Sequence, residues 1–227
     1  MGVIDRAAAV LSAVEDGARS LGAIQAATGL TRSTTHRLVT SLEDHGFLFR
    51  VGGLGYALGP RLLGLASAAM RELPLRELAR PALERLARST GESAQLYVRD
   101  GDRRICVDTV ESDRELRTIV DVGASLPLTK GSAGKVFLAW GPGPQAEEID
   151  DRLSQQIATT RRRGWADSVG EREEGVASVS APVFGPANEL LAAISVSGPA
   201  SRLAPLRAKT YAPAVLDAAR EVAATLL

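Results

Sequence analysis

Three short helical patterns, each followed by a glycine, fill the first 46 residues and limit the folds open to this chain. Apolar residues recur every three or four positions over 4–16, and a second, shorter pattern covers about 21–27. A third helix is expected to begin at a cap formed by Thr31 or Ser33 and to stop at Gly46. Two apolar arms around a glycine-rich turn follow directly and predict a β-hairpin. Three helices and a hairpin in so short a segment predict a winged helix-turn-helix.

The third helix carries its polar side chains at its front, while Thr35, Leu38 and Leu42 are expected to face the other two helices. A recognition helix in the DNA major groove presents mainly its N-terminal residues to base edges and phosphates. A short helical hairpin with a polar face has the same pattern without binding DNA, and the hairpin that follows favours the DNA-binding interpretation. The side chains expected to contact double-stranded DNA are Thr31, Arg32, Ser33, Thr34, His36, Arg37 and, on the hairpin, Arg50.

A proline divides the chain into two domains. We predict a DNA-binding domain over 1–58, a linker helix over 59–73 and a second domain over 74–227, because Pro74 breaks the linker helix. The strands of the second domain come as hairpins, so we expect an antiparallel sheet. Both domains together predict an α+β chain.

Local patterns place the elements of the second domain. A helix is expected over 75–89. The stretch "SAQLYVRDGDRRICVDTV" predicts two strands joined by an Asp-Gly turn, and "ELRTIVDVG" predicts one more strand. The small residues of "GSAGKVFLAW" begin a helix, and a polar helix is expected over about 145–163. "GVASVSAPVF" and "ELLAAISVSG" predict a second hairpin, and a helix over 204–227 closes the chain.

Composition excludes several classes of protein. The 27 basic residues equal the 27 acidic ones, so DNA binding must rest on the third helix rather than on an excess of positive charge. One cysteine and two histidines leave no internal disulfide and no cluster for structural zinc. No apolar run reaches the roughly 18 residues that cross a bilayer, and the first residues form an amphipathic helix rather than a secretion signal. We therefore expect a cytoplasmic protein without a metal site or a membrane partner.

Patterns for catalysis and nucleotide binding are poor in the second domain. "KGSAGKV" departs from a phosphate-binding loop, because Thr129 stands at the first glycine position and Val136 replaces the hydroxyl residue that holds magnesium. This domain has no histidine to activate a serine, and Cys106 lies in a predicted strand where an inert thiol is expected. The run "GEREEG" is typical of a solvated loop. We predict no catalytic residue and no cofactor. Asp or Glu bases leave a small-molecule enzyme, or a sensor that does not read DNA, as the alternative.

Serines alternate along both strands of the last hairpin. Ser178 and Ser180 are expected on one face of the sheet, and so are Ser195 and Ser197. Either these hydroxyl groups face solvent, or they face a small polar ligand that supplies hydrogen-bond partners among strongly apolar neighbours. The pattern alone leaves both alternatives open.

Several blocks of the chain resemble the IclR-type bacterial transcription regulators. The first half contributes "VIDRAAAVLSAV", "TGLTRSTTHRLVTSLEDHGFL" and "YALGPRLLGLA". The second half contributes "LARPALERLARSTGESAQLYV", "GSAGKVFLAW", "RRRGWADSVGEREEGVASVSAPV" and "AAISVSGPASRL" in that family's order. The resemblance implies a regulator with an N-terminal winged helix-turn-helix and a C-terminal GAF-like effector domain. It also implies a homodimer or tetramer on an inverted-repeat operator. A second domain that serves only for oligomerisation remains an alternative.

The resemblance also implies an effector pocket formed by the small-residue helix start, the loop after the "RGW" block and the last two strands. Ser168 and Ser178 stand where relatives carry an acidic residue and a cysteine, and Lys130 adds a cation, so we expect a small carboxylate, an amino acid or a keto acid. "ESAQLYVRDGDRRICV" and "GEREEGVASVSAPVFGPAN" are closest to actinobacterial NdgR- or LtbR-like regulators, which implies amino-acid (leucine) biosynthesis genes as targets. The implied effector-binding residues are Lys130, Ser132, Ala133, Asp167, Ser168, Ser178, Ser195 and Ser197.

Overall fold

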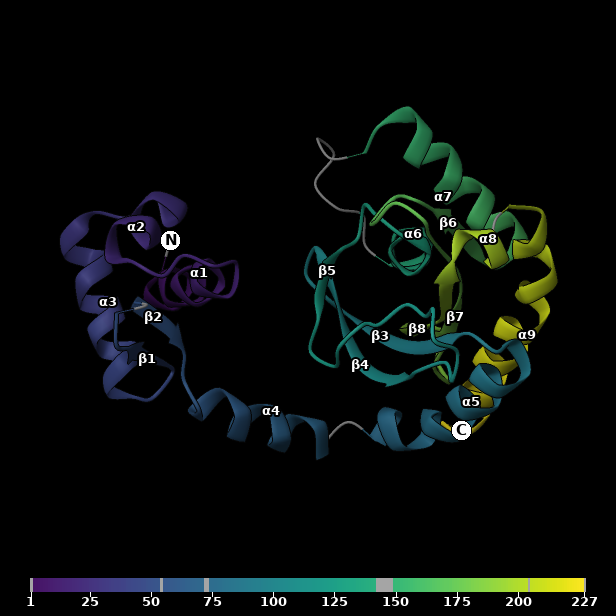
Figure 1. Ribbon diagram of the computed structural model, residues 1–227, viewed down its shortest axis with the longest axis horizontal. Helices are drawn as coiled ribbons and strands as arrows, with labels where there is room; N and C mark the ends of the chain where they lie inside the picture. Colours follow the sequence, from purple (N-terminus) through teal and green to yellow (C-terminus); the bar gives the residue numbers. More distant parts are fainter. Residues whose placement is uncertain (1, 54, 72–73, 142–148, 204, 227) are drawn as a thin grey trace. The chain divides into compact units, whose positions relative to one another are not determined.

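The computed structural model consists of two compact units, Met1–Glu72 and Leu73–Leu227 (Figure 1). Each unit has a hydrophobic core of its own. The residues that the structure describes are 2–53, 55–71, 74–141, 149–203 and 205–226.

The first unit is a winged helix-turn-helix followed by one more helix, as the sequence predicts. Ser20 caps the second helix by accepting a hydrogen bond from the Ala23 amide at 3.1 Å, and Gly29 ends that helix with a left-handed φ of 65°. The core of the unit includes Val10, Val14, Ile24, Val39, Leu48 and Tyr56. The elements are α1 (Val3–Glu15), α2 (Leu21–Thr28), α3 (Arg32–Asp44), β1 (Leu48–Val51), β2 (Gly55–Leu58) and α4 (Arg61–Arg71).

Two close backbone contacts hold the β1–β2 wing against the helices. The Tyr56 amide donates to the Arg19 carbonyl at 2.7 Å, and the Gly59 amide donates to the Phe47 carbonyl at 2.7 Å. Gly59 lies so near the turn after α3 that a Cβ atom on it would be 2.1 Å from the Gly46 carbonyl oxygen. Only glycine permits this approach, so the wing is fixed by a residue with no side chain.

The second unit is built on a six-stranded sheet in which every neighbouring pair of strands is antiparallel. The strand order is β5-β4-β3-β8-β7-β6. The strands are β3 (Ser93–Asp100), β4 (Arg103–Val110), β5 (Ser125–Pro127), β6 (Ala166–Val169), β7 (Val176–Phe184) and β8 (Leu190–Pro199). The helices are α5 (Pro74–Thr90), α6 (Ser132–Trp140), α7 (Asp151–Arg163), α8 (Ala200–Leu203) and α9 (Pro205–Ala224).

Helices cover both faces of the sheet (Figure 1). The long helices α5 and α9 pack together on one face and bury apolar side chains of β3, β7 and β8. On the other face lies α6, which is buried along its length except at its last residue and is backed by α7. This arrangement confirms the antiparallel α+β fold predicted for the second half.

The strand predicted from "ELRTIVDVG" is wrong. Residues 111–124 form an irregular connection, and the short β5 strand that follows them pairs with β4 instead. The alternation that suggested a strand has a different cause: Thr118 and Val120 are buried, while Leu116 and Ile119 are 65% and 54% exposed. Only the last residue of "ELRTIVDVG" reaches β4, where the Gly123 amide donates to the Cys106 carbonyl at 2.7 Å, and regular strand pairing starts at Ser125.

Two other boundaries differ from expectation. Residues 166–169, expected within a loop, form the edge strand β6, whose short and half-polar sequence carries almost no strand signal. The polar helix expected from about 145 begins at Asp151, where the Asp150 carboxylate accepts the Leu153 amide at 2.7 Å. Residues 145–148 of that prediction lie outside the described part of the chain.

We predict that Gly59→Ala lowers the free energy of unfolding of the first unit by about 1–3 kcal/mol, because the added methyl group forces the wing away from the turn after α3. Urea unfolding followed by far-UV circular dichroism measures the change. Gly22→Ala is the matched control, because nothing lies within 4 Å of its Cβ position on α2. That variant is expected to be neutral or more stable by up to about 1 kcal/mol. Equal unfolding midpoints for the two variants would contradict the prediction.

Candidate functional site

The front of α3 is organised by Thr31, which is the residue that caps this helix. Its hydroxyl oxygen accepts a hydrogen bond from the Thr34 amide at 3.4 Å, and its hydroxyl group donates to the Thr34 hydroxyl oxygen at 2.9 Å. One turn further, the buried Thr35 donates to the Thr31 carbonyl at 3.0 Å. The cap therefore leaves the first turn of the helix ordered and its outer face open.

The side chains predicted to contact DNA differ in their solvent exposure and in their hydrogen-bond partners. Arg32, Ser33, His36 and Arg37 are exposed, and Thr34 is half-buried. Among the described residues, no hydrogen bond or ion pair involves the side chains of Arg32, His36 or Arg37. Two uncompensated guanidinium groups therefore project from the front half of α3.

Arg50 on the wing is tied to its own unit. Its guanidinium donates to the Tyr56 hydroxyl at 2.6 Å, lies 4.9 Å from the centre of that ring and forms an ion pair with Glu43 at 3.5 Å. The ion pair with Glu43 holds the wing against α3. An anion near Arg50 would have to compete with these contacts.

A groove of about 480 Å³ beside α3 brings in a residue that the sequence prediction missed. Thr34, His36 and Arg37 line it from α3, and Val3 and Arg6 line it from α1. Arg6 thus adds a third guanidinium near the predicted residues. Its place on the first helix gave no sign of this, because the helix pattern does not say which of its polar residues face α3.

In the second unit, the four alternating serines form one compact block. The register pairs Ser178 with Ser197 and Ser180 with Ser195 across β7 and β8, so all four share one sheet face. The Ser180 hydroxyl donates to the Ser195 oxygen at 2.8 Å, and Ser132 at the start of α6 lies 2.6 Å from both Ser178 and Ser180. Apart from the half-buried Ser178, these hydroxyl groups are buried, so the solvent-facing alternative is wrong.

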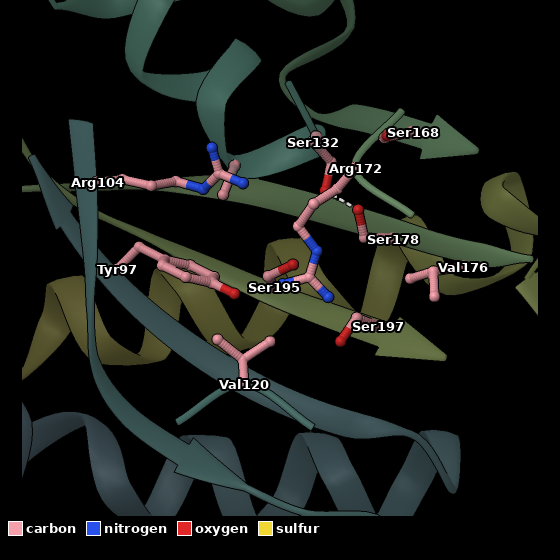
Figure 2. A pocket seen from close by; sticks show the side chains of 12 residues that line it. Tyr97, Arg104, Val120, Ser132, Ser168, Arg172, Val176, Ser178, Ser195 and Ser197 are labelled. Atoms are coloured by element: carbon pink, nitrogen blue, oxygen red, sulfur yellow. Dashed lines mark hydrogen bonds between the residues drawn. The ribbon is translucent and has the colours of Figure 1, made fainter. Parts of the chain in front are cut away.

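A small cavity lies over this block (Figure 2). Its volume is about 30 Å³, which is room for roughly two water molecules. It brings together Ser132, Ala133, Ser168, Ser178, Ser195 and Ser197 of the predicted set. The other residues lining it are Tyr97, Arg104, Val120, Gly131, Arg172 and Val176.

Lys130 and Asp167 lie outside the cavity. Lys130 is exposed and lines a separate surface groove with Asp150 and Arg152, while its carbonyl accepts a hydrogen bond from Arg104 at 2.8 Å. The Asp167 carboxylate accepts a hydrogen bond from Arg163. Adjacent residues of a strand point to opposite faces, so β6 directs Ser168 into the cavity and Asp167 away from it.

The cations of the cavity come instead from Arg104 and Arg172, which sequence reasoning missed. Arg104 is 3% exposed and lies 5.4 Å from the centre of the Tyr97 ring. Burial lowers the pKa of Arg104 to about 10, and the nearby charge of Arg172 acts in the same direction. Arg172 is the single basic residue of the charge run "GEREEG", and nothing in that run indicates that its side chain lines the cavity.

The small residues at the start of α6 serve close packing against the chain itself. A Cβ atom on Gly134 would lie 2.1 Å from the Leu128 carbonyl oxygen, and Gly131 has a left-handed φ of 86°. Lys135, one turn into the helix, is buried and its ammonium group donates to Glu171 at 2.5 Å and to the Asp167 carbonyl at 2.9 Å. These contacts fix the helix start as one wall of the cavity.

No cluster of three or more His, Cys, Asp or Glu side chains among the described residues could hold a metal ion. Within the same residues, no helix is long and apolar enough to cross a bilayer.

Two family models together match most of the chain. The IclR helix-turn-helix domain matches residues 3–52, and the bacterial transcriptional regulator IclR C-terminal domain matches residues 67–224. The glycerol operon regulatory protein of Streptomyces griseus is 34% identical over 219 residues, covering 89% of this chain and 86% of that protein. The transcriptional repressor IclR of Escherichia coli is 31% identical over 229 residues, covering 92% and 84%. A solved structure of an IclR transcriptional regulator from Silicibacter sp. matches with a TM-score of 0.85 at 25% identity, covering 99% and 96%.

We predict that the Cys106 thiol reacts with a disulfide reagent such as DTNB on the order of a thousandfold more slowly in the native protein than after unfolding at pH 8. Burial raises the pKa of Cys106 to about 12, so the reactive thiolate is scarce until the pH is far above the usual value near 8.5. The native rate should therefore still rise about tenfold per pH unit at pH 9. A native rate that levels off near pH 8.5 would contradict the prediction.

Proposed function

The chain belongs to the IclR family of bacterial transcriptional regulators, and from this membership we propose how it reads DNA and what controls it. We propose that the front of α3 enters the major groove of an inverted-repeat operator and that a small metabolite bound in the second unit changes the affinity for that operator. DNA binding and transcriptional regulation are properties of the family. The DNA contacts, the effector and the target genes are our proposals.

The observation that carries the DNA-binding proposal is the pair of unpartnered arginines on α3. Arg32 and Arg37 are exposed within the first six residues of the helix, and neither is neutralised by a described carboxylate. Arginine donates two hydrogen bonds to guanine in the major groove, and a helix N-terminus attracts phosphate. The proposed contacts are Thr31, Arg32, Ser33, Thr34, His36 and Arg37, with Arg6 and Arg50 nearer the DNA backbone.

A homodimer would match the proposed operator, because two symmetry-related recognition helices fit successive major grooves. Exposed apolar side chains in the first unit support such an interface. Val3 and Ile4 on α1 are 71% and 80% exposed, and Leu63 and Leu65 on α4 are 72% and 43% exposed. Side chains of this kind are unfavourable in water and suit a subunit contact.

The serine block and the cavity above it support metabolite control. Hydroxyl groups in an enclosed site give a small polar ligand directional partners, and a ligand that prefers one arrangement of the protein shifts its population. The resemblance to NdgR- and LtbR-like regulators supports an amino acid or keto acid as effector and amino-acid biosynthesis genes as targets. The proposed effector contacts are Ser132, Ala133, Ser168, Ser178, Ser195 and Ser197.

Footprinting on the DNA upstream of the chain's own gene and its neighbours tests the whole proposal. We expect a protected inverted repeat whose protection changes when leucine or its keto-acid precursors are added. If none of these fragments is protected at low ionic strength, the DNA-binding proposal is overturned. Protection that no member of the amino-acid and keto-acid series alters would overturn the effector class.

We predict that Arg37→Ala weakens operator binding by about 1–3 kcal/mol, since one bidentate contact to a guanine is lost. A gel-shift titration on the footprinted fragment measures the change. Arg88→Ala on α5 removes the same charge from an exposed position of the second unit and is expected to bind like the unchanged protein. Equal dissociation constants for the Arg37 and Arg88 variants would remove Arg37 from the proposed contacts.

We predict that the double change Ser195→Ala and Ser197→Ala abolishes the response to effector and leaves DNA binding intact, because the hydroxyl partners of the ligand disappear from the cavity floor. The footprint is measured with and without the effector found above. Ser154→Ala with Ser201→Ala, both exposed, is the matched control and should keep the response. An unchanged response in the Ser195 and Ser197 variant would contradict the cavity as the effector site.

A further inference from the structure

The wall of the cavity carries two positive charges and no carboxylate. Among its twelve lining residues, Arg104 and Arg172 are the charged ones, and the rest are serines, small or apolar residues and Tyr97. Elsewhere in this unit buried charges are paired: Glu92, which is fully buried, contacts Arg202 at 2.6 Å and Arg114 at 3.3 Å. Enclosed charges are costly unless they have a partner of opposite sign, so the cavity stands out as lacking an anion.

Arg104 is held in place by the backbone. Its Nη1 atom donates to the Lys130 carbonyl at 2.8 Å and also to the Pro127 carbonyl. The buried Nε atom has no hydrogen-bond partner among the described residues. Gly131 leaves the space that the guanidinium occupies, because a Cβ atom there would lie 2.9 Å from the Nη2 atom. Arg104 is therefore a fixed cation whose Nε–H group has no described hydrogen-bond acceptor.

The backbone of Arg172 is fixed in a short loop, whereas its side chain has no described hydrogen-bond partner. It lies in the loop between β6 and β7, whose ends Gly170 and Gly175 have left-handed φ angles of 69° and 79°. The side chain runs into the cavity and ends between Ser195 and Ser197 (Figure 2). No hydrogen bond or ion pair of its guanidinium is found within the part of the chain that the structure describes.

The neighbouring Glu171 offsets the charge of this pair only in part. Its negative charge acts on Arg104 in the direction that raises the pKa, but its carboxylate already accepts other hydrogen bonds. One oxygen accepts from the Lys135 ammonium at 2.5 Å, and the other accepts from the Gly131 amide at 3.0 Å. These contacts anchor the loop to the start of α6 one residue before Arg172. The anchor leaves the arginine side chain itself free to turn.

We propose that the carboxylate of the effector binds between the guanidinium groups of Arg104 and Arg172, and that Arg172 now occupies the place that the rest of the ligand takes. This inference rests on the proposed function of the cavity as the effector site. A cavity of about 30 Å³ is too small for an amino acid or a keto acid, so the Arg172 side chain must leave the serine block as a ligand enters. The freed serines then contact the ligand's oxo or amino group, and Arg172 closes on the carboxylate.

Isothermal titration of the full-length chain with paired probes tests the inference. The probes are 2-oxo and 2-amino acids of two to six carbons, 4-methyl-2-oxopentanoate and leucine included, each paired with its neutral primary amide. The amide keeps the shape of the acid and removes its negative charge. We expect at least one acid to bind about 10-fold or more tightly than its amide, since charge-assisted hydrogen bonds exceed neutral ones.

Arg172→Gln should lower the acid-to-amide affinity ratio about 10- to 100-fold, and it removes no described contact that holds the fold. Arg162→Gln is the matched control, because this exposed arginine of α7 donates, among the residues that the structure describes, to Thr159 alone. Its ratio should stay unchanged. Arg104→Lys should also lower the ratio, with thermal unfolding showing whether the variant remains folded.

Four results would overturn the inference: no acid of the series binds, amides bind as well as acids, Arg172→Gln keeps the ratio, or Arg172→Gln binds the acid more tightly because the arginine is only an obstruction. Footprinting with the same probes separates this inference from the proposed function. If amides bind as well as acids and change operator protection, the proposal of metabolite control is supported and the proposed carboxylate site between the two arginines is rejected. If acids bind through the pair without changing protection, the anion site stands and metabolite control fails.

Discussion

The register between β7 and β8 is the constraint on which the second unit depends. Because Ser178 pairs with Ser197 and Ser180 with Ser195, one face of this hairpin is a patch of hydroxyl groups. The residues between them point the other way and complete the apolar core under α5 and α9. A shift of one residue would put serines into that core and apolar side chains into the cavity. The same pairing therefore supports folding and creates the polar site.

Sequence patterns predicted the elements that have a strong period and a clear end. The three N-terminal helices, the Asp-Gly hairpin and the serine hairpin are confirmed, because amphipathic spacing and glycine stops are local properties. The alternating pattern of residues 115–123 predicted a strand that does not form. Its alternation reflects two buried side chains on a loop, and only the neighbouring strands decide whether an alternating segment pairs.

The candidate sites were predictable to different degrees. The exposed front of α3 follows from helix geometry, so Arg32 and Arg37 could be named in advance. Strand alternation likewise placed the serines on one face. Arg172 could not be found this way, since a residue in a charge run gives no sign of facing inward. The sequence suggests Lys130 as the cation of the pocket, whereas the structure places Arg104 and Arg172 there and Lys130 outside.

The Glu171 anchor has a consequence for how quickly the protein can respond. Because the loop is fastened to Gly131 and Lys135 one residue before Arg172, clearing the cavity requires a side-chain rotation and not the release of a loop. A rotation of one side chain moves far fewer atoms than a lid opening, which takes on the order of microseconds or longer. Entry of a ligand would then seldom be the slow step. The residence time of the bound metabolite would determine how long a transcriptional state persists after its concentration falls.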